Sequence, residues 1–255
     1  MENLSEREKI EQKQKNHFDH IAGEYEANYD DEYSSKYRNL FINKPMLDSL
    51  GLKDKIVLEA LCGSGQTTEY LLSRGAQVIG LDISEKLVES FKKRWPSAQV
   101  VQKSIFDTHF ESNSFDVVVI VGGLHHLHPC VPEAMNEIYR VLKTGGYFCF
   151  AEPYSSSFVN LVRKMWYKHD PLFERNEGPI DLDMLMKKYS LKFNYVETKY
   201  IGSIAFLLVL NSMIFRIPTK LKKYYSDLVM NIEKHFSRIH TKKTACLSLN
   251  TWQKI

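Results

Sequence analysis

Short apolar segments of strand length recur along the chain, and segments with helical periodicity lie between the early ones. The apolar segments occupy residues 55–61, 77–83, 98–104, 115–123, 147–153, 192–201 and 243–254. The helical patterns occupy residues 66–75, 84–95 and 131–146, and each ends at a Gly or Pro stop signal. Strands that alternate with helices of this length predict βαβ units and a buried, mostly parallel sheet.

A glycine turn after the first apolar segment is the strongest chemical signal. In "VLEALCGSGQTTEYLL", residues 57–72, a strand leads through Gly63 and Gly65 into a helix. Such a turn lets the backbone approach a ligand at the helix N-terminus. Asp82 ends the second strand, where a carboxylate can accept hydrogen bonds from ribose hydroxyls. The third glycine of a dinucleotide fingerprint is replaced by Thr68, which counts against NAD.

From about Phe18 to Glu152, the chain resembles the class I S-adenosylmethionine-dependent methyltransferases, in particular their small-molecule, ubiquinone-biosynthesis-like branch. The motifs that carry the resemblance are "LEALCGSG", "VIGLDIS", "SIFDTHFESNSFDVVVIVGGLHHL", "EIYRVLKTGGYF" and "HFDHIAGEYEANYD". The resemblance implies a Rossmann-like, doubly wound, seven-stranded sheet, mostly parallel with an antiparallel last strand, plus helical lids. It implies one domain over residues 1–255, divided into an N-terminal lid (1–45), a cofactor-binding core (46–153), a lid and substrate segment with strand six (154–242) and the last strand (243–255).

The resemblance also implies the cofactor, S-adenosyl-L-methionine, and the residues that bind it. Asp82 would bind the ribose, Ile83 would pack on the adenine, and Phe18 and Tyr25 belong to a segment that closes over the methionine end. At Ser104 the family often has Asp. The full expected set is Phe18, Tyr25, Glu59, Ala60, Leu61, Cys62, Gly63, Gly65, Asp82, Ile83, Ser104, Ile105 and Val121.

Leu61 departs from the family pattern, which has glycine at this position. A leucine has no steric difficulty where φ is negative. We therefore expect Leu61 to end the first strand in β conformation, with its side chain turned into the core or the lid. The alternative is a weakened, altered or absent cofactor site.

Methyl transfer sometimes needs a base to deprotonate the acceptor, and "GGLHHLHP" follows the fourth strand at the expected edge. Histidine is a suitable base for a hydroxyl or an amine. The candidate catalytic residues are His126, preferred over its neighbour His125, and Glu152 at the end of the fifth strand. A structural role, in packing or capping, is the alternative for each. We expect no metal site.

Composition adds few constraints. A net charge of +3 and the absence of a basic stripe argue against a nucleic-acid partner. Four separated cysteines and a charged start predict reduced thiols and a cytoplasmic setting. The apolar segment 203–215 is too short to span a bilayer. It predicts a buried helix, a substrate wall or an interfacial helix, so residues 203–223 could form a weak peripheral membrane or homodimer contact.

These patterns predict a methyltransferase that modifies an oxygen or nitrogen of a small molecule, with a glycan- or lipid-pathway intermediate as one option. Two alternatives remain open. One is a catalytically silent binding protein of the same fold, which Leu61 favours, and the other is a nicotinamide-dependent oxidoreductase. Substrate choice is expected to depend on residues 155–240.

Overall fold

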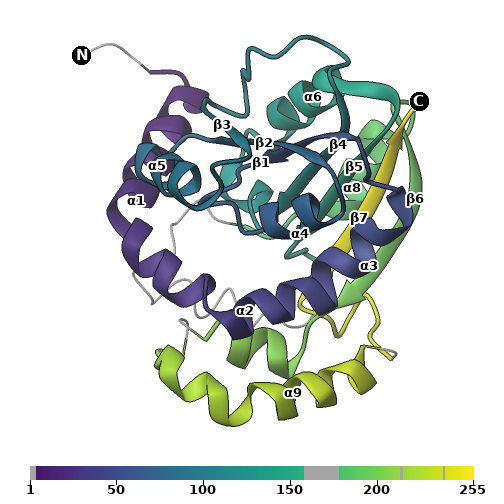
Figure 1. The fold of residues 1–255 in the computed structure, drawn as a ribbon. Coiled ribbons are helices and arrows are strands. Elements are labelled where there is room, and N and C mark those ends of the chain that lie inside the picture. Colours follow the sequence, from purple (N-terminus) through teal and green to yellow (C-terminus); the bar gives the residue numbers. More distant parts are fainter. Residues whose placement is uncertain (1–3, 158–177, 213–214, 238) are drawn as a thin grey trace.

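A computed structural model describes residues 4–157, 178–212, 215–237 and 239–255 of the chain. Seven strands form one sheet in the order β3-β2-β1-β4-β5-β7-β6 (Figure 1). β7 is antiparallel to both β5 and β6, whereas the other neighbouring strands pair in parallel. The predicted doubly wound sheet with an antiparallel last strand is therefore confirmed.

The strands alternate with helices along the first half of the chain, as the hydrophobic pattern predicts. The strands are β1 (Ile56–Ala60), β2 (Gln77–Asp82), β3 (Gln99–Gln102), β4 (Phe115–Val121), β5 (Leu142–Glu152), β6 (Phe193–Ile201) and β7 (Leu247–Lys254). The longer helices are α1 (Glu6–Tyr29), α2 (Glu32–Tyr37), α4 (Thr68–Ser73), α5 (Glu85–Arg94), α6 (Val131–Val141), α8 (Leu182–Tyr189) and α9 (Lys222–Phe236). Short helical pieces complete the described parts: η1 (Arg38–Asn43), α3 (Lys44–Leu47), η2 (Asp48–Leu50), η3 (Leu124–Leu127), η4 (Phe206–Leu210) and η5 (Thr219–Leu221).

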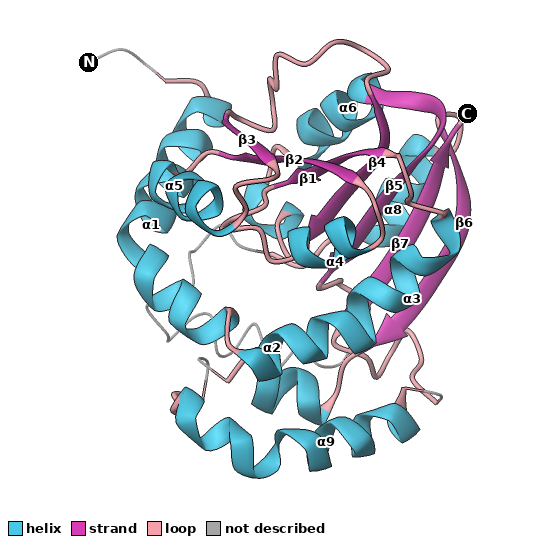
Figure 2. Cartoon of the chain, in the orientation of Figure 1, coloured by secondary structure: helices cyan, strands magenta, loops and turns pink. Residues whose placement is uncertain are grey.

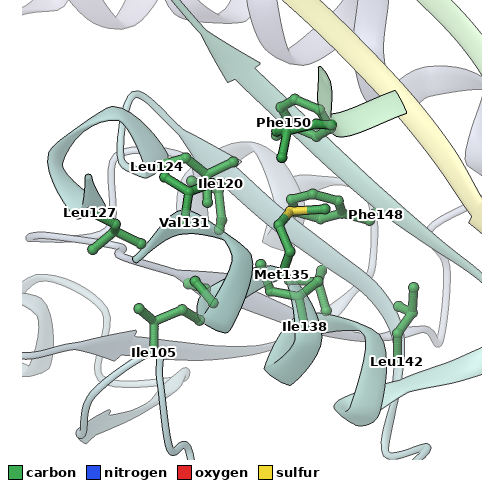
Figure 3. Close-up of a cluster of buried hydrophobic side chains, with 14 of the residues drawn as sticks. Ile105, Ile120, Leu124, Leu127, Val131, Met135, Ile138, Leu142, Phe148 and Phe150 are labelled. Atoms are coloured by element: carbon green, nitrogen blue, oxygen red, sulfur yellow. The ribbon is translucent and has the colours of Figure 1, made fainter. Parts of the chain in front are cut away.

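The two faces of the sheet bury two separate apolar clusters, because successive side chains of a strand point to opposite faces. In β4, Val118 and Ile120 join one cluster, while Val117 and Val119 join the other. The first cluster includes residues of α6 and α8. Figure 3 shows the part of it where Val131, Met135 and Ile138 of α6 lie beside Phe148 and Phe150 of β5. The second packs against α2, α3, α4, η4 and α9, so helices cover both faces (Figure 2). Both faces of the central strands are therefore buried.

One predicted element boundary was wrong. The helix expected to run to Gly146 ends at Val141. The next residue, Leu142, has an extended backbone, begins β5 and pairs with Phe115 of β4.

The apolar segment 203–215, for which a buried helix was one expectation, is helical over residues 204–210, and Phe206, Val209 and Leu210 of its π-helical turn η4 are buried. Most residues from 205 to 212 face inward, whereas Ile204, Phe215 and Leu221 are exposed, so the peripheral contact expected over 203–223 stays a prediction. Residues 158–177 of the lid and substrate segment expected over 154–242 lie outside the described residues.

α1 begins with a capping box, in which Ser5 accepts a hydrogen bond from the Glu8 N–H and Glu8 Oε2 accepts one from the Ser5 N–H at 2.7 Å. The helix runs past α5 along one side of the sheet, and α2 and α3 continue from it across the molecule (Figure 1). α9 lies at the bottom edge in this view, beyond α2. Among the described residues, no helix is both long enough and apolar enough to cross a bilayer.

Candidate cofactor site and histidine loop

A cavity of about 820 Å³, counted to its open mouth, lies between α1 and the carboxyl ends of β1, β2 and β4. The predicted binding residues that line it are Phe18, Tyr25, Glu59, Ala60, Leu61, Cys62, Gly63, Asp82, Ile83, Ser104, Ile105 and Val121. Of the predicted set, Gly65 alone does not line the cavity.

Gly65 instead serves the glycine turn itself. Its φ is +84°, and a Cβ at this position would lie 2.5 Å from Trp95 Nε1. The Trp95 indole donates a hydrogen bond to the Ser64 carbonyl at 3.0 Å, so it closes against the turn from outside. A side chain at position 65 would therefore break the turn, whereas the cavity wall is formed by Gly63 at φ +54°.

The expected β conformation of Leu61 was wrong, because its φ is +53°. A non-glycine residue in this left-handed region is strained by roughly 1–2 kcal/mol. Its side chain packs on the first apolar cluster, in agreement with the expected direction. Space for it comes from Gly123, where a Cβ would lie 2.7 Å from Leu61 Cδ1 and 2.9 Å from Leu61 Cβ. The turn therefore keeps the geometry of a glycine loop with leucine in one of its positions.

Glu59 is a buried carboxyl on the cavity wall at the end of β1. Its oxygens accept hydrogen bonds from the Thr67 N–H at 2.9 Å and the Thr68 hydroxyl at 2.5 Å. Burial raises the pKa of Glu59 to about 7, although these bonds and the Arg38 charge oppose the shift. Thr68, at the position of the missing third glycine, thus helps to hold this carboxyl, which is poised to change charge near neutral pH.

Asp82 is the second buried carboxyl of the cavity. Its Oδ2 accepts the Gly63 N–H at 2.8 Å, and its Oδ1 accepts the Ser84 N–H at 2.9 Å. Burial raises the pKa of Asp82, and these backbone hydrogen bonds oppose the rise. Since each carboxylate oxygen accepts more than one hydrogen bond, Asp82 can still accept from ligand hydroxyls. The bond to Gly63 also ties the ends of β1 and β2 together.

Cys62, between these carboxyls, is a buried thiol. Burial and the Asp82 and Glu59 charges hold its pKa well above the usual range for a cysteine. A thiolate is the reactive form of cysteine, so Cys62 contributes only its small apolar volume to the wall.

Two carboxylates of α1 and the carboxylate of Asp30, directly after its last residue, accept hydrogen bonds from serine hydroxyls in the loops that follow β1, β2 and β3. The donor–acceptor pairs are Ser64 to Asp30 at 2.8 Å, Ser84 to Asp19 at 2.6 Å and Ser104 to Glu11 at 2.5 Å. We call these three contacts the serine latches. They hold α1 across the cavity mouth along its whole length, so this helix is a lid attached to the edge of the sheet that binds ligands in folds of this kind.

The latch at Ser104 bears on the missing family aspartate. Ser104 accepts the Phe106 N–H at 3.1 Å and donates to Glu11, and both Ser104 and Glu11 line the cavity. A carboxylate is therefore present at this corner of the site, but α1 supplies it. Sequence reasoning missed Glu11 because it lies far from Ser104 in the chain, within a charged segment that has no motif.

An aromatic row connects the lid to the loop after β4. Phe18 makes edge contacts with Tyr25, at 5.9 Å between ring centroids, and with His126 at 5.3 Å. Burial raises the pKa of Tyr25 to about 12, so its hydroxyl stays protonated. His126 lines the cavity beside these rings. Among the predicted catalytic residues it is the one that faces the cavity.

His125 and Glu152 lie behind His126. Glu152 is fully buried, and its Oε1 accepts the N–H groups of Gly123 and Leu124, each at 2.7 Å. Its Oε2 lies 2.8 Å from His125 Nδ1, which therefore carries the proton in this bond. The His125 and His126 rings lie 4.0 Å apart between centroids. Neither His125 nor Glu152 lines the cavity, so their expected direct part in catalysis has no geometric support, and their contacts position the loop.

Further lining residues went unpredicted. Ile10, Glu11 and Gln14 come from the first half of α1, ahead of the segment that carries the family resemblance. The serine cap before Glu6 was a usable signal for a helix there, but nothing local showed which side faces a ligand. The others are Gln66, Thr67, Leu87, Phe106, Gly122, Gly123 and Leu127. Within the described parts of the chain, no group of three or more His, Cys, Asp or Glu could hold a metal ion.

Comparison with known proteins agrees with this geometry. Residues 58–150 match the family model described as a methyltransferase domain. Over this region the chain is similar to a methyltransferase domain. This chain is 38% identical over 97 residues to a methyltransferase of Synechocystis, an alignment that covers 38% of this chain and 46% of the relative.

Two further comparisons extend the likeness. The chain is 33% identical over 126 residues to the phthiotriol/phenolphthiotriol dimycocerosates methyltransferase of Mycobacterium tuberculosis, with 48% of this chain and 46% of that protein covered. The chain therefore spans less than half the length of these relatives. An Archaeoglobus fulgidus SAM-dependent methyltransferase structure aligns over 91% of this chain and 99% of its own, with a TM-score of 0.62 and 17% identity. That match shows a shared fold.

Proposed function

We propose that this protein transfers a methyl group from S-adenosylmethionine to a hydroxyl or amine of a small molecule. The observation that carries the proposal is the cavity, which combines the glycine turn with two buried carboxyls and a histidine under one lid. Asp82, at the end of β2, would accept hydrogen bonds from the ribose hydroxyls, and Ile83 would pack on the adenine. Glu59 would take the positively charged amino group of the methionine portion.

When bound, S-adenosylmethionine supplies an electrophilic methyl group on a sulfonium centre. The protein's part is to orient the acceptor, exclude water and accept a proton. In this proposal His126 accepts that proton from the acceptor, because it faces the cavity from the loop after β4. Glu152 fixes the loop through Gly123, Leu124 and His125 and so positions His126 without touching the acceptor.

The nature of the acceptor also belongs to the proposal. A small molecule agrees with an M. tuberculosis relative named for phthiotriol and phenolphthiotriol dimycocerosates. We propose an oxygen or nitrogen nucleophile, with lipid- or glycan-pathway intermediates as the first compounds to test.

Titration calorimetry with S-adenosylhomocysteine and with NAD tests the cofactor assignment. We expect S-adenosylhomocysteine to bind and NAD to give no heat of binding. Asp82→Ala should weaken S-adenosylhomocysteine binding at least tenfold, because a hydrogen bond to a charged group contributes about 1.5–3 kcal/mol. Asp227→Ala, the same substitution at an exposed position of α9 that does not line the cavity, is the matched control and should bind like the unchanged protein. Binding of NAD alone would overturn the proposal.

The two alternatives make different predictions. A nicotinamide enzyme is disfavoured by the antiparallel β7 inserted between β5 and β6, since the dinucleotide fold has the parallel order 3-2-1-4-5-6. A catalytically silent binding protein would bind S-adenosylhomocysteine and yet transfer no methyl group to any acceptor. Mass analysis of acceptors incubated with S-adenosylmethionine separates this alternative from the enzyme.

A further inference from the structure

Helix α9 exposes large apolar residues on its outer side, although its inner side also packs on the protein. Its buried positions are Lys222, Ser226, Met230 and Glu233, and Tyr225 and Val229 are partly buried against the second apolar cluster. Leu221, immediately before it, is 41% exposed, Tyr224 is 74% exposed and Leu228 is 65% exposed. These three are spaced by three and four residues, so they share one side of the helix axis. Soluble surface helices normally turn their apolar side inward, so this arrangement calls for something to cover the outer side.

Polar anchors hold α9 against the rest of the protein. Lys222 Nζ lies 2.5 Å from Asp31 Oδ2 and 2.8 Å from Ser34 Oγ, at the start of α2. Glu233 accepts hydrogen bonds from the Ser203 N–H at 2.7 Å and the Ala205 N–H at 3.0 Å. A buried charge is retained only when it is paired in this way. These bonds fix the helix in an orientation that leaves Leu221, Tyr224 and Leu228 exposed.

The charge of this region is unlike that of the rest of the chain. In the sequence, residues 216–243 contain eight lysines and arginines and two acidic residues, a net charge of +6. Because the whole chain carries +3, the remainder carries −3. Lys220, Lys223 and Lys234 are exposed beside the apolar stripe, and Lys223 Nζ lies 4.8 Å from the centre of the Tyr224 ring.

We propose that the outer side of α9, with Leu221, Tyr224 and Leu228 and the flanking Lys220, Lys223 and Lys234, binds an anionic lipid surface. Apolar side chains set between lysines are the pattern of helices that lie in a membrane interface. Each lysine near such a surface contributes attraction to the negative headgroups. A second copy of the chain fits less well, because a symmetric contact would bring the same lysines of two copies together. This binding does not depend on the proposed methyl transfer.

Vesicle sedimentation with the full chain tests the proposal. We expect the chain to bind vesicles of phosphatidylcholine with 30% phosphatidylglycerol at low salt, more weakly at high salt, and not to bind pure phosphatidylcholine. The pair Lys220→Gln/Lys223→Gln should weaken binding about 25-fold, fivefold for each charge. The pair Tyr224→Ser/Leu228→Ser should weaken it at least tenfold, because two large side chains no longer leave water.

Matched controls separate this surface from general charge and stickiness. Lys92→Gln/Lys93→Gln removes two exposed lysines from α5, and Leu191→Ser/Val196→Ser removes two apolar residues that are 91% and 56% exposed near β6. Both controls should bind vesicles like the unchanged protein. An unchanged thermal unfolding midpoint will show that each variant is folded. This measurement does not depend on cofactor binding.

Three results would overturn the proposal. The first is no binding to the phosphatidylglycerol vesicles at low salt, and the second is an equal loss in the control variants. The third is a concentration-dependent dimer in sedimentation velocity that Tyr224→Ser/Leu228→Ser abolishes, which would assign the surface to a second copy of the chain.

Discussion

The charge of Glu59 should make cofactor binding depend on pH in a way that can be calculated. Its pKa is about 7 in the structure, where no ligand is bound. If the carboxylate form binds the methionine amino group, the apparent dissociation constant is the intrinsic one divided by the ionised fraction. That fraction is about 0.9 at pH 8 and about 0.1 at pH 6. The dissociation constant of S-adenosylhomocysteine should therefore rise about tenfold between pH 8 and pH 6.

Glu59→Gln is the perturbation that isolates this effect. The amide can still accept the Thr67 N–H and donate to Thr68, so the wall should keep its shape. Loss of the charge should weaken binding at pH 8 by about 1.5–3 kcal/mol, roughly 10- to 150-fold. The remaining affinity should vary little from pH 6 to pH 8. Calorimetry in buffers of different ionisation enthalpy should also show proton release on binding at pH 7 in the unchanged protein and none from this site in the variant.

The same residue makes an opposite prediction for stability. Burial raises the pKa of Glu59 from 4.5 to about 7, so between these values the folded state holds a proton that the unfolded state has lost. Stability of the ligand-free protein should accordingly fall as pH rises through this range, by up to about 3 kcal/mol from this group. Glu59→Gln should remove that loss, so the variant should unfold at a higher temperature than the unchanged protein at pH 8 while binding more weakly.

Glu137→Gln is a matched control with the reverse sign. Burial acts to raise the pKa of Glu137, but bonds with Arg140 and Thr108 outweigh it and lower the pKa to about 2. This substitution should destabilise the protein at pH 8 and leave S-adenosylhomocysteine binding unchanged, because Glu137 does not line the cavity. A dissociation constant of the unchanged protein that stays flat from pH 8 to pH 6 would refute the reasoning for Glu59.

Three further predictions address the lid, the turn and the loop. Ser104→Asp introduces the residue common in the family and should weaken S-adenosylhomocysteine binding at pH 8, because the new carboxylate would lie next to that of Glu11. Adding Glu11→Gln to this variant should restore binding, and failure to restore it would contradict this account. Gly123→Ala should cost about 1–3 kcal/mol of stability by overpacking, and Leu61→Gly should largely remove that cost in a double-mutant cycle; additive effects would show that the two residues do not touch. His126→Ala should lower the methyl-transfer rate about 10²–10⁴-fold with S-adenosylhomocysteine affinity nearly unchanged, whereas a loss below tenfold would move His126 from catalysis to architecture.

The sheet could be predicted from the sequence because its central strands are buried on both faces. Val117 to Ile120 form an unbroken apolar run, and such runs between glycine turns and amphipathic helices have few other interpretations. The glycine turn and Asp82 were predictable for a related reason. Their spacing follows from one strand, one helix and the next strand, all of which are local in the chain.

The errors have a different physical origin, since each depends on contacts between residues far apart in the chain. The positive φ of Leu61 is tolerated because Gly123, after β4, leaves room for the side chain. No residue near Leu61 in the sequence indicates that this space exists. The serine latches are also long-range. Each pairs an acidic residue in α1 or directly after it with a serine that lies far away in the chain. A pattern of single residues carries no information about such pairs.

α9 shows why hydrophobic pattern alone cannot orient a helix. Leu221, Tyr224 and Leu228 are exposed, whereas the structure buries Lys222 and Glu233 beside Met230. Burial of Lys222 lowers its pKa, and its bond and charge interaction with Asp31 oppose that shift. A buried ion pair that loses one partner is strongly destabilised, so the Asp31 and Ser203 contacts decide which side faces in. Leu221, Tyr224 and Leu228 then face outward because Lys222 and Glu233 are held in their inward bonds on the other side of the helix.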